Sequence, residues 1–321
     1  MRTFASIGIF CMLAFVCGCS KKNEKLGIAD YEISNYTQLS YKEELYSDKV
    51  CVANEDINET TFAPSENAMK IGLFDLNKRE VLYAKDIHQS LYPASTTKIM
   101  TALVALEYGN LDDVVTISKT AAASSFQANE QVCGIKEGEQ VTLLDLLHGL
   151  VLYSGNDTSV AIAEHISGDV QSFSTLMNQK ATELFATRTN YVNPHGLHDD
   201  DQYTTAYDLY LIFNEAINNE VFMDIIEKPS YNMTLTAQDG TTREIKCEAT
   251  NYYSSNRVAQ PTAVTVIGGK TGTTNEAGSC VILYSLDTMS NPYISIIMNA
   301  SSRNVLYKDM TNLLNAVGLE E

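Results

Sequence analysis

The sequence predicts one α/β domain whose sheet joins segments from both ends of the chain. Alternating apolar residues, typical of strands, occur near residues 69–83 and again over 263–300, while the stretch between them has helical periodicity. The chain has 321 residues, of which 45% are hydrophobic, enough for a sizeable core. Strands at both ends with helices between them favour a single sheet built from distant segments.

The N-terminal residues predict export. Arg2 precedes an apolar run over residues 7–16, which is too short to cross a bilayer but suits a signal peptide. Residues 16–19, Val-Cys-Gly-Cys, resemble a bacterial lipobox, in which the cysteine after a small residue becomes the lipidated N-terminus. We therefore expect a signal peptide over residues 1–18 and a lipid on Cys19 that anchors the chain to the outer face of the cell membrane. Cleavage of an ordinary secretory signal is the alternative.

Residues 19–66 are expected to form an acidic tether between the lipid and the domain. The segment is polar, and tyrosines recur every five residues from Tyr31 to Tyr46, a spacing that fits neither a helix nor a strand. The domain itself is expected over residues 67–321.

The elements of the domain follow in order. Residues 69–83 predict a strand hairpin that turns at Asn77 and Lys78. Helices are predicted over residues 95–108, which end at Gly109, over 141–167, and over 206–217 with Thr204 or Thr205 as the N-cap. Strands are predicted over 263–267, 280–286 and 293–300, followed by a last helix over 307–317.

The charge balance and the cysteines exclude two classes of function. Lys plus Arg number 22 against 40 Asp plus Glu, so the net charge of −18 repels phosphate backbones and no nucleic-acid partner is expected. The four cysteines beyond Cys19 contain no C-x-x-C pair and no accompanying histidine, so no zinc site is expected. They allow up to two disulfides or, equally well, free buried thiols: Cys51, Cys133, Cys247 and Cys280.

Three short motifs carry the chemistry, and only their combination is informative. They are Ser95-Thr96-Thr97-Lys98, Ser154-Gly155-Asn156 and Lys270-Thr271-Gly272. In this order they resemble the active-site set of the penicillin-recognising serine enzymes. With the surrounding residues 93–102, 193–197 and 270–274, the chain is similar to the D-alanyl-D-alanine carboxypeptidases, low-molecular-mass penicillin-binding proteins, over about residues 68–317. The resemblance implies a β-lactamase/transpeptidase-like fold, with an antiparallel sheet built from N- and C-terminal segments plus a helical subdomain.

The first motif makes physical sense without the resemblance. The i, i+3 spacing puts Ser95 and Lys98 on one helix face, and Ser95 lies at the helix start, where unpaired N–H groups favour negative charge. A lysine can act as the base for a serine only if its pKa falls well below the usual ~10.4. Burial and a second cation lower that pKa, and Lys270 is the candidate for the cation. We therefore expect a neutral Lys98 that accepts the Ser95 proton.

The resemblance also assigns roles to the other two motifs. It implies that Ser154 relays a proton to the leaving group and that Asn156 hydrogen-bonds the substrate peptide. Lys270 and Thr271 would hold a terminal carboxylate, and Gly272 would let the substrate approach the backbone. The oxyanion hole would be the backbone N–H groups of Ser95 and Thr273.

The reaction implied is acyl transfer from peptidoglycan stem peptides. Ser95 would attack the carbonyl of the penultimate D-alanine, the terminal D-alanine would leave, and water would release the acyl-enzyme. Penicillins and other β-lactams would acylate the same serine. No cofactor and no metal are expected.

Two features depart from the expected pattern or compete with it. Relatives carry an arginine after the final strand that helps to bind the carboxylate, whereas this chain has Leu306 at the aligned position and only Arg303 nearby. The run from His195 to Asp201 contains candidate metal ligands, although Asn-Pro-His-Gly-Leu is a loop signature of the family. The chain contains enough histidines for a Ser-His-Asp triad, which is therefore an alternative to the lysine base. It has no G-x-S-x-G motif, however, and this favours the lysine.

Three rival functions remain on the same fold. A serine β-lactamase of class A would need an E-x-x-L-N element, which is absent between Ser154 and Lys270, and S-D-N in place of S-G-N. A D,D-endopeptidase that cuts cross-links shares every motif. A lipid-tethered protein that binds the wall without turnover is the alternative to an enzyme, and the three complete motifs argue against it.

Overall fold

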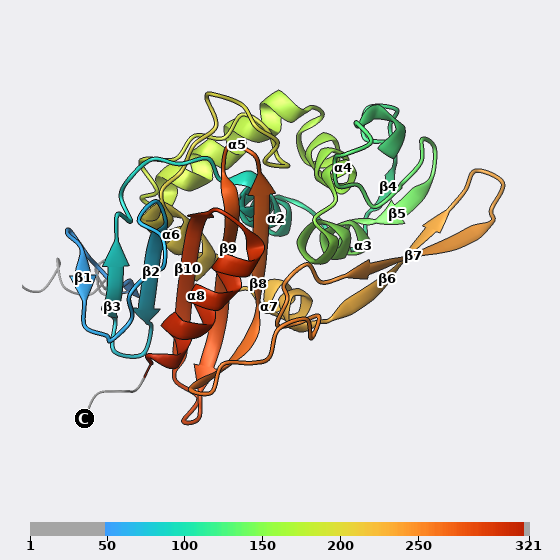
Figure 1. Ribbon diagram of the computed structural model, residues 1–321. Helices are drawn as coiled ribbons and strands as arrows, with labels where there is room; N and C mark the ends of the chain where they lie inside the picture. Colours follow the sequence, from blue (N-terminus) through green and yellow to red (C-terminus); the bar gives the residue numbers. More distant parts are fainter. Residues whose placement is uncertain (1–48, 318–321) are drawn as a thin grey trace, which may run out of the picture. The chain divides into compact units, whose positions relative to one another are not determined.

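The computed structural model describes residues 49–317, and the folded unit begins at Val50 (Figure 1). The predicted signal peptide, the lipid site at Cys19 and most of the tether lie outside the described residues. The tether was predicted to reach residue 66, whereas residues 50–66 pack on the domain. The Cys51 N–H donates to the Tyr210 hydroxyl at 2.7 Å, and the Ser65 N–H and hydroxyl donate to the Asp309 carboxylate at 2.7 and 2.8 Å. The apolar side chain of Phe62 is buried in the same core, so the domain boundary lies earlier than predicted.

The main sheet has six antiparallel strands in the order β1-β3-β2-β10-β9-β8. The N-terminal strands are β1 (Ile57–Asn58), β2 (Lys70–Asp75) and β3 (Glu80–Lys85). The C-terminal strands are β8 (Val264–Thr274), β9 (Gly278–Asp287) and β10 (Pro292–Ala300). Register pairs Ile294 of β10 with Phe74 of β2 on one side and with Tyr284 of β9 on the other. The predicted joining of the two ends of the chain in one antiparallel sheet is therefore confirmed.

Helices cover both faces of this sheet because its strands are apolar on both sides (Figure 1). The C-terminal helix α8 (Arg303–Asn315) lies across β10 and β9 and buries Met310, Leu313 and Leu314 against them. It begins four residues earlier than predicted, because the Ser302 hydroxyl caps it by accepting from the Val305 N–H. On the opposite face α6 (Ala206–Ala216) packs on β2 and β10, and Thr205 is its N-cap.

The segment between the two halves of the sheet forms the helical part of the molecule. A 3₁₀ turn, η2 (Ala94–Thr97), leads into α2 (Lys98–Tyr108), which ends at Gly109 as predicted. The predicted helical stretch 141–167 contains three pieces: α3 (Leu143–His148), a π-helical turn η4 (Gly149–Tyr153) and α4 (Asn156–Ser167). The helices α5 (Val170–Glu183) and α7 (Glu220–Glu227) and the short 3₁₀ turn η3 (Ala123–Ser125) were not predicted.

A second, four-stranded sheet lies beside the helices and was also missed. Its order is β4-β5-β6-β7, built from β4 (Val114–Thr116), β5 (Gln140–Thr142), β6 (Ser230–Thr236) and β7 (Thr242–Glu248). The four cysteines beyond Cys19 are all free thiols, so neither of the disulfides that the sequence allowed is formed. Within residues 49–317 no helix combines the length and the apolar character that crossing a membrane requires.

Candidate active site

The first motif is held at the turn that begins α2. Ser95 lies in η2, where the hydroxyls of Thr96 and Thr97 donate back to the carbonyls of Pro93 and Ala94 at 2.6 and 2.8 Å. The preceding Ala94 has a φ of +49°, a strained backbone for a residue with a side chain. Gly196 packs closely against this turn, since a Cβ on it would lie 1.9 Å from the Ala94 carbonyl oxygen. The backbone around Ser95 is thus fixed from two sides.

The Lys98 amine is fully buried and makes three contacts. It lies 3.1 Å from Ser95 Oγ, 2.7 Å from Asn156 Oδ1 and 2.5 Å from the main-chain oxygen of His195. Burial, and then the charge of Lys270, hold the pKa of this amine well below its ordinary value. A neutral amine has two N–H groups and one lone pair. Because the two carbonyl oxygens can only accept, they take both N–H groups and leave the lone pair to the Ser95 hydroxyl.

The second motif places Ser154 and Asn156 on the opposite wall. Ser154 follows the π-helical turn in a left-handed conformation with φ of +69°, and Asn156 begins α4. The Asn156 N–H donates to the Gln131 carbonyl at 2.8 Å, which ties this wall to the loop before it. The helical stretch is interrupted here, because the π-turn η4 ends at Tyr153 and α4 starts only after Gly155.

The buried Asp157 carboxylate, next to Asn156, holds that loop in place. It accepts from the N–H groups of Cys133, Gly134 and Ile135 at 2.9, 2.8 and 3.2 Å. Burial is the largest influence and raises its pKa, while these hydrogen bonds act in the opposite direction. Three donors on one carboxylate join the loop over residues 131–135 to the start of α4.

Lys270 meets the second motif from β8. Its amine donates to Ser154 Oγ at 2.8 Å and to the Thr271 carbonyl at 3.0 Å, and burial lowers its pKa to about 7. The sequence placed this motif after a strand that ends near residue 267, but a bulge between Val266 and Gly268 lets β8 continue to Thr274. The motif is therefore part of the edge strand of the sheet, where one row of backbone groups stays unpaired.

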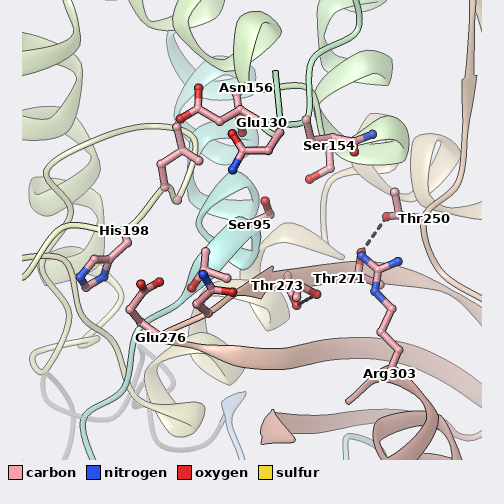
Figure 2. A pocket seen from close by; sticks show the side chains of 17 residues that line it. Ser95, Glu130, Ser154, Asn156, His198, Thr250, Thr271, Thr273, Glu276 and Arg303 are labelled. Atoms are coloured by element: carbon pink, nitrogen blue, oxygen red, sulfur yellow. Dashed lines mark hydrogen bonds between the residues drawn. The ribbon is translucent and has the colours of Figure 1, made fainter. Parts of the chain in front are cut away.

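The strand β8 passes close to the serine. A Cβ on Gly272 would lie 3.0 Å from the Ser95 backbone nitrogen, so a side chain at this position would require the backbone around Ser95 to shift by a few tenths of an ångström. The Thr271 hydroxyl donates to Thr250 Oγ1 at 2.7 Å (Figure 2). Thr273, whose N–H the sequence suggested for an oxyanion hole, lines the same cavity as Ser95.

These groups surround a cavity of about 530 Å³. Figure 2 shows Ser95 near its centre, with Arg303 extending toward Thr271 on one side and with Glu276 and His198 on the other. Arg303, the first residue of α8, does line the cavity, whereas Leu306 is buried in the core. Two of the site residues predicted from the sequence, Lys98 and Lys270, are fully buried and do not line the cavity themselves. Cys19 lies outside the described residues.

Several lining residues were not identified from the sequence. Thr250, Glu130, Gln131 and Glu276 all face the cavity, yet none belongs to one of the three motifs. They come from loops that reach the site only through the tertiary fold. No spacing pattern in the sequence marked them.

The loop over residues 195–201, whose composition suggested metal ligands, contributes a backbone hydrogen-bond acceptor to the site. His195 contributes its main-chain oxygen to Lys98, and burial lowers the pKa of its imidazole to about 3. The hydrogen bond of the Ser95 hydroxyl is to the lysine amine, not to an imidazole. His198 lies 3.4 Å from Asp200, and among residues 49–317 no three His, Cys, Asp or Glu side chains gather at a potential metal site.

The sequence and structure match those of known proteins. Residues 57–302 match the Peptidase_S11 family, described as D-alanyl-D-alanine carboxypeptidase. The carboxypeptidase DacA of Haemophilus influenzae is 31% identical over 252 residues, which cover 77% of this chain and 61% of that protein. DacB2 of Mycobacterium tuberculosis is 35% identical over 63% of this chain and 65% of its own length. The chain thus spans about three fifths of the length of the first of these relatives.

Solved structures agree with this assignment. The S216A mutant of the Streptomyces K15 DD-transpeptidase superposes with a TM-score of 0.73 at 28% identity, covering 79% of this chain and 98% of that one. Penicillin-binding protein 5 from Haemophilus influenzae gives a TM-score of 0.68 at 30% identity, covering 79% and 71% of the two chains. The fold expected from the three motifs is therefore confirmed, and the chain belongs to the S11 peptidase family of D-alanyl-D-alanine carboxypeptidases.

Proposed function

We propose that this chain is a serine D-alanyl-D-alanine carboxypeptidase that removes the terminal D-alanine from peptidoglycan stem peptides. The observation that carries the proposal is the contact of the Ser95 hydroxyl with a buried lysine amine whose two N–H groups are both engaged by carbonyl oxygens. A lone pair directed at a serine hydroxyl is what a general base requires.

The acylation step follows from this geometry. The Ser95 oxygen attacks the carbonyl carbon of the penultimate D-alanine while its proton moves to Lys98. Negative charge develops on the carbonyl oxygen, which the N–H groups of Ser95 and Thr273 would receive, an interaction whose removal costs ~3 kcal/mol in other enzymes. Ser154 then relays this proton from Lys98 to the leaving nitrogen, so that its own hydroxyl is restored, the C–N bond breaks, and an ester remains on Ser95.

Substrate binding uses the two ends of the cavity. The carboxylate of the leaving D-alanine would be held by Thr271 and Arg303, which lie at the same end. Because Asn156 Oδ1 accepts from Lys98, the N–H groups of the Asn156 amide remain for a carbonyl of the substrate peptide. Water then hydrolyses the ester and restores the Ser95 hydroxyl. A β-lactam would acylate the same oxygen and leave more slowly.

Two measurements test the proposal. Incubation with a pentapeptide that ends in D-Ala-D-Ala should release D-alanine, and labelled penicillin should attach to one site per molecule. Ser95→Ala should abolish both, whereas the control Ser172→Ala, at an exposed serine near the start of α5, should change neither. Stoichiometric labelling of Ser95→Ala would overturn the assignment. Turnover of nitrocefin as fast as its initial acylation would instead indicate a β-lactamase.

We further propose that the protein works outside the cytoplasm, anchored by a lipid on Cys19. The support is the apolar run at residues 7–16 followed by the lipobox-like sequence. Metabolic labelling with a radioactive fatty acid should mark the protein, and Cys19→Ala should lose the label and release the chain from membranes. Labelling that survives this substitution would contradict the anchor.

A further inference from the structure

A second cavity adjoins the active site at Arg303. It has a volume of about 390 Å³, and it lies between α8 and the loop after β7. We call it the Arg303 groove and define it by Tyr252, Arg257, Arg303, Tyr307 and Lys308. Arg303 lines both this groove and the active-site cavity, and a small third cavity shares Thr271 with the active-site cavity and Tyr252 with the groove. The groove therefore starts at Arg303, the residue proposed to bind the substrate carboxylate.

The groove collects positive charge in a strongly acidic protein. Three cations line it, although the chain has only 22 Lys and Arg against 40 Asp and Glu. Within residues 49–317, no carboxylate lies within ion-pair distance of Arg257, Arg303 or Lys308. Arg243, in contrast, pairs with Glu139 at 2.6 Å. Like charges that share a cavity and have no ion-pair partner repel one another and favour an anionic ligand.

Two stacked tyrosines form part of the groove, and one of them contacts Arg257. The Tyr252 and Tyr307 rings lie 4.6 Å apart at an interplanar angle of 6°, and the Tyr252 N–H donates to the Tyr307 hydroxyl at 2.9 Å. The Arg257 guanidinium lies 5.3 Å from the centroid of the Tyr252 ring. A hydrogen bond from Arg303 is the largest influence on the Tyr252 phenol and lowers its pKa against the effect of burial, and Arg257 acts in the same direction as Arg303. Two guanidinium groups thus converge on one side chain at the entrance to the groove.

The proposed orientation of the substrate indicates which of its groups can reach the positive charge of the groove. If Arg303 and Thr271 bind the α-carboxylate of the leaving residue, then only that residue's side chain, or a peptide attached to it, extends past Arg303. The methyl group of D-alanine is too short to use the groove. We propose that the Arg303 groove is a second anion subsite, which accepts a carboxylate carried by the side chain or the attached peptide of the leaving residue. This inference rests on the proposed function, and it adds anionic leaving groups, such as those of cross-linked stem peptides, to the substrates.

Matched peptides test the subsite. Three acyl dipeptides share D-alanine on the acyl side and end in D-alanine, D-glutamate or D-glutamine. The last two differ only in charge at nearly equal size. We expect kcat/KM for the D-glutamate peptide to exceed that for the D-glutamine peptide roughly fivefold or more, because the added carboxylate meets cations that have no ion-pair partner.

Variants assign this preference to the groove. The double substitution R257Q and K308Q should bring the ratio of the two kcat/KM values close to one and leave D-Ala-D-Ala turnover unchanged. The control Lys246→Gln removes one exposed cation on β7 and should preserve the preference. Equal rates for the two peptides in the unsubstituted protein, with D-Ala-D-Ala turnover intact, would overturn the subsite alone. Absence of both D-alanine release and penicillin labelling would overturn the proposed function.

Discussion

Replacement of Lys270 by methionine should stabilise the fold while it disables the chemistry. Lys270 is fully buried, and burial lowers the pKa of its amine from 10.5 to about 7. At about 1.4 kcal/mol per tenfold change in proton affinity, a charged Lys270 below pH 7 costs roughly 5 kcal/mol of folding free energy. The unfolded chain keeps this proton up to about pH 10.5 and the folded chain loses it near pH 7. Stability attributable to Lys270 is therefore lost as the pH falls from 10.5 to 7.

The substitution also removes two hydrogen bonds, to Ser154 Oγ and to the Thr271 carbonyl. Their loss costs roughly 1–3 kcal/mol. The free energy of unfolding of Lys270→Met at pH 6 should therefore exceed that of the unsubstituted protein by about 2–4 kcal/mol, and this advantage should vanish or reverse near pH 10. Urea titrations at the two pH values measure both differences.

The rate of acylation of Ser95, in contrast, should fall in Lys270→Met. Without the Lys270 charge the pKa of Lys98 rises, and Ser154 loses the donor that orients it, so the rate of labelling by penicillin should fall at least ~100-fold. Lys246→Met, at an exposed lysine paired with Glu248, should change neither quantity appreciably. A Lys270→Met protein that is less stable than the unsubstituted one at pH 6, or a stability difference that is the same at both pH values, would refute the reasoning.

Three further predictions follow from buried groups. The Asp157 carboxylate accepts from four backbone N–H groups, two on each oxygen, so Asp157→Asn leaves two of them facing an amide nitrogen. We therefore expect the unfolding free energy in urea to fall by about 2–4 kcal/mol; an unchanged value would mean that the loop does not depend on this carboxylate. Because burial lowers the pKa of His195 to about 3, its imidazole should stay neutral from pH 5 to 8, and a titrating NMR signal for it in that range would contradict the burial. Burial raises the pKa of Cys51 to about 11 and of Cys280 to about 12, so both thiols should react with Ellman's reagent at pH 8 slowly in the folded protein and rapidly in urea.

The sequence predicted best those features that depend on short spacings. The hairpin around Asn77, the stop at Gly109 and the contact of Ser95 with Lys98 all follow from residues a few positions apart, where covalent geometry limits the outcomes. It failed where a local pattern was ambiguous. The leucine-rich stretch 141–167 predicted helix, but the periodicity did not show the π-turn or the left-handed Ser154 within it. The bulge between Val266 and Gly268, after which β8 continues through Lys270, cannot be distinguished in the sequence from the end of a strand.

The motifs alone identified the residues that we propose carry the chemistry, because a nucleophile, a base and a carboxylate-binding strand need particular side chains at particular spacings. Only the tertiary structure decided their electrostatic state. Lys270 meets Ser154 from 116 residues away, and the His195 carbonyl reaches Lys98 across 97 residues. The Arg303 groove likewise combines α8 with a loop after β7. Burial and the direction of a lone pair depend on everything packed around a group, and that packing is set by long-range contacts that no local spacing specifies.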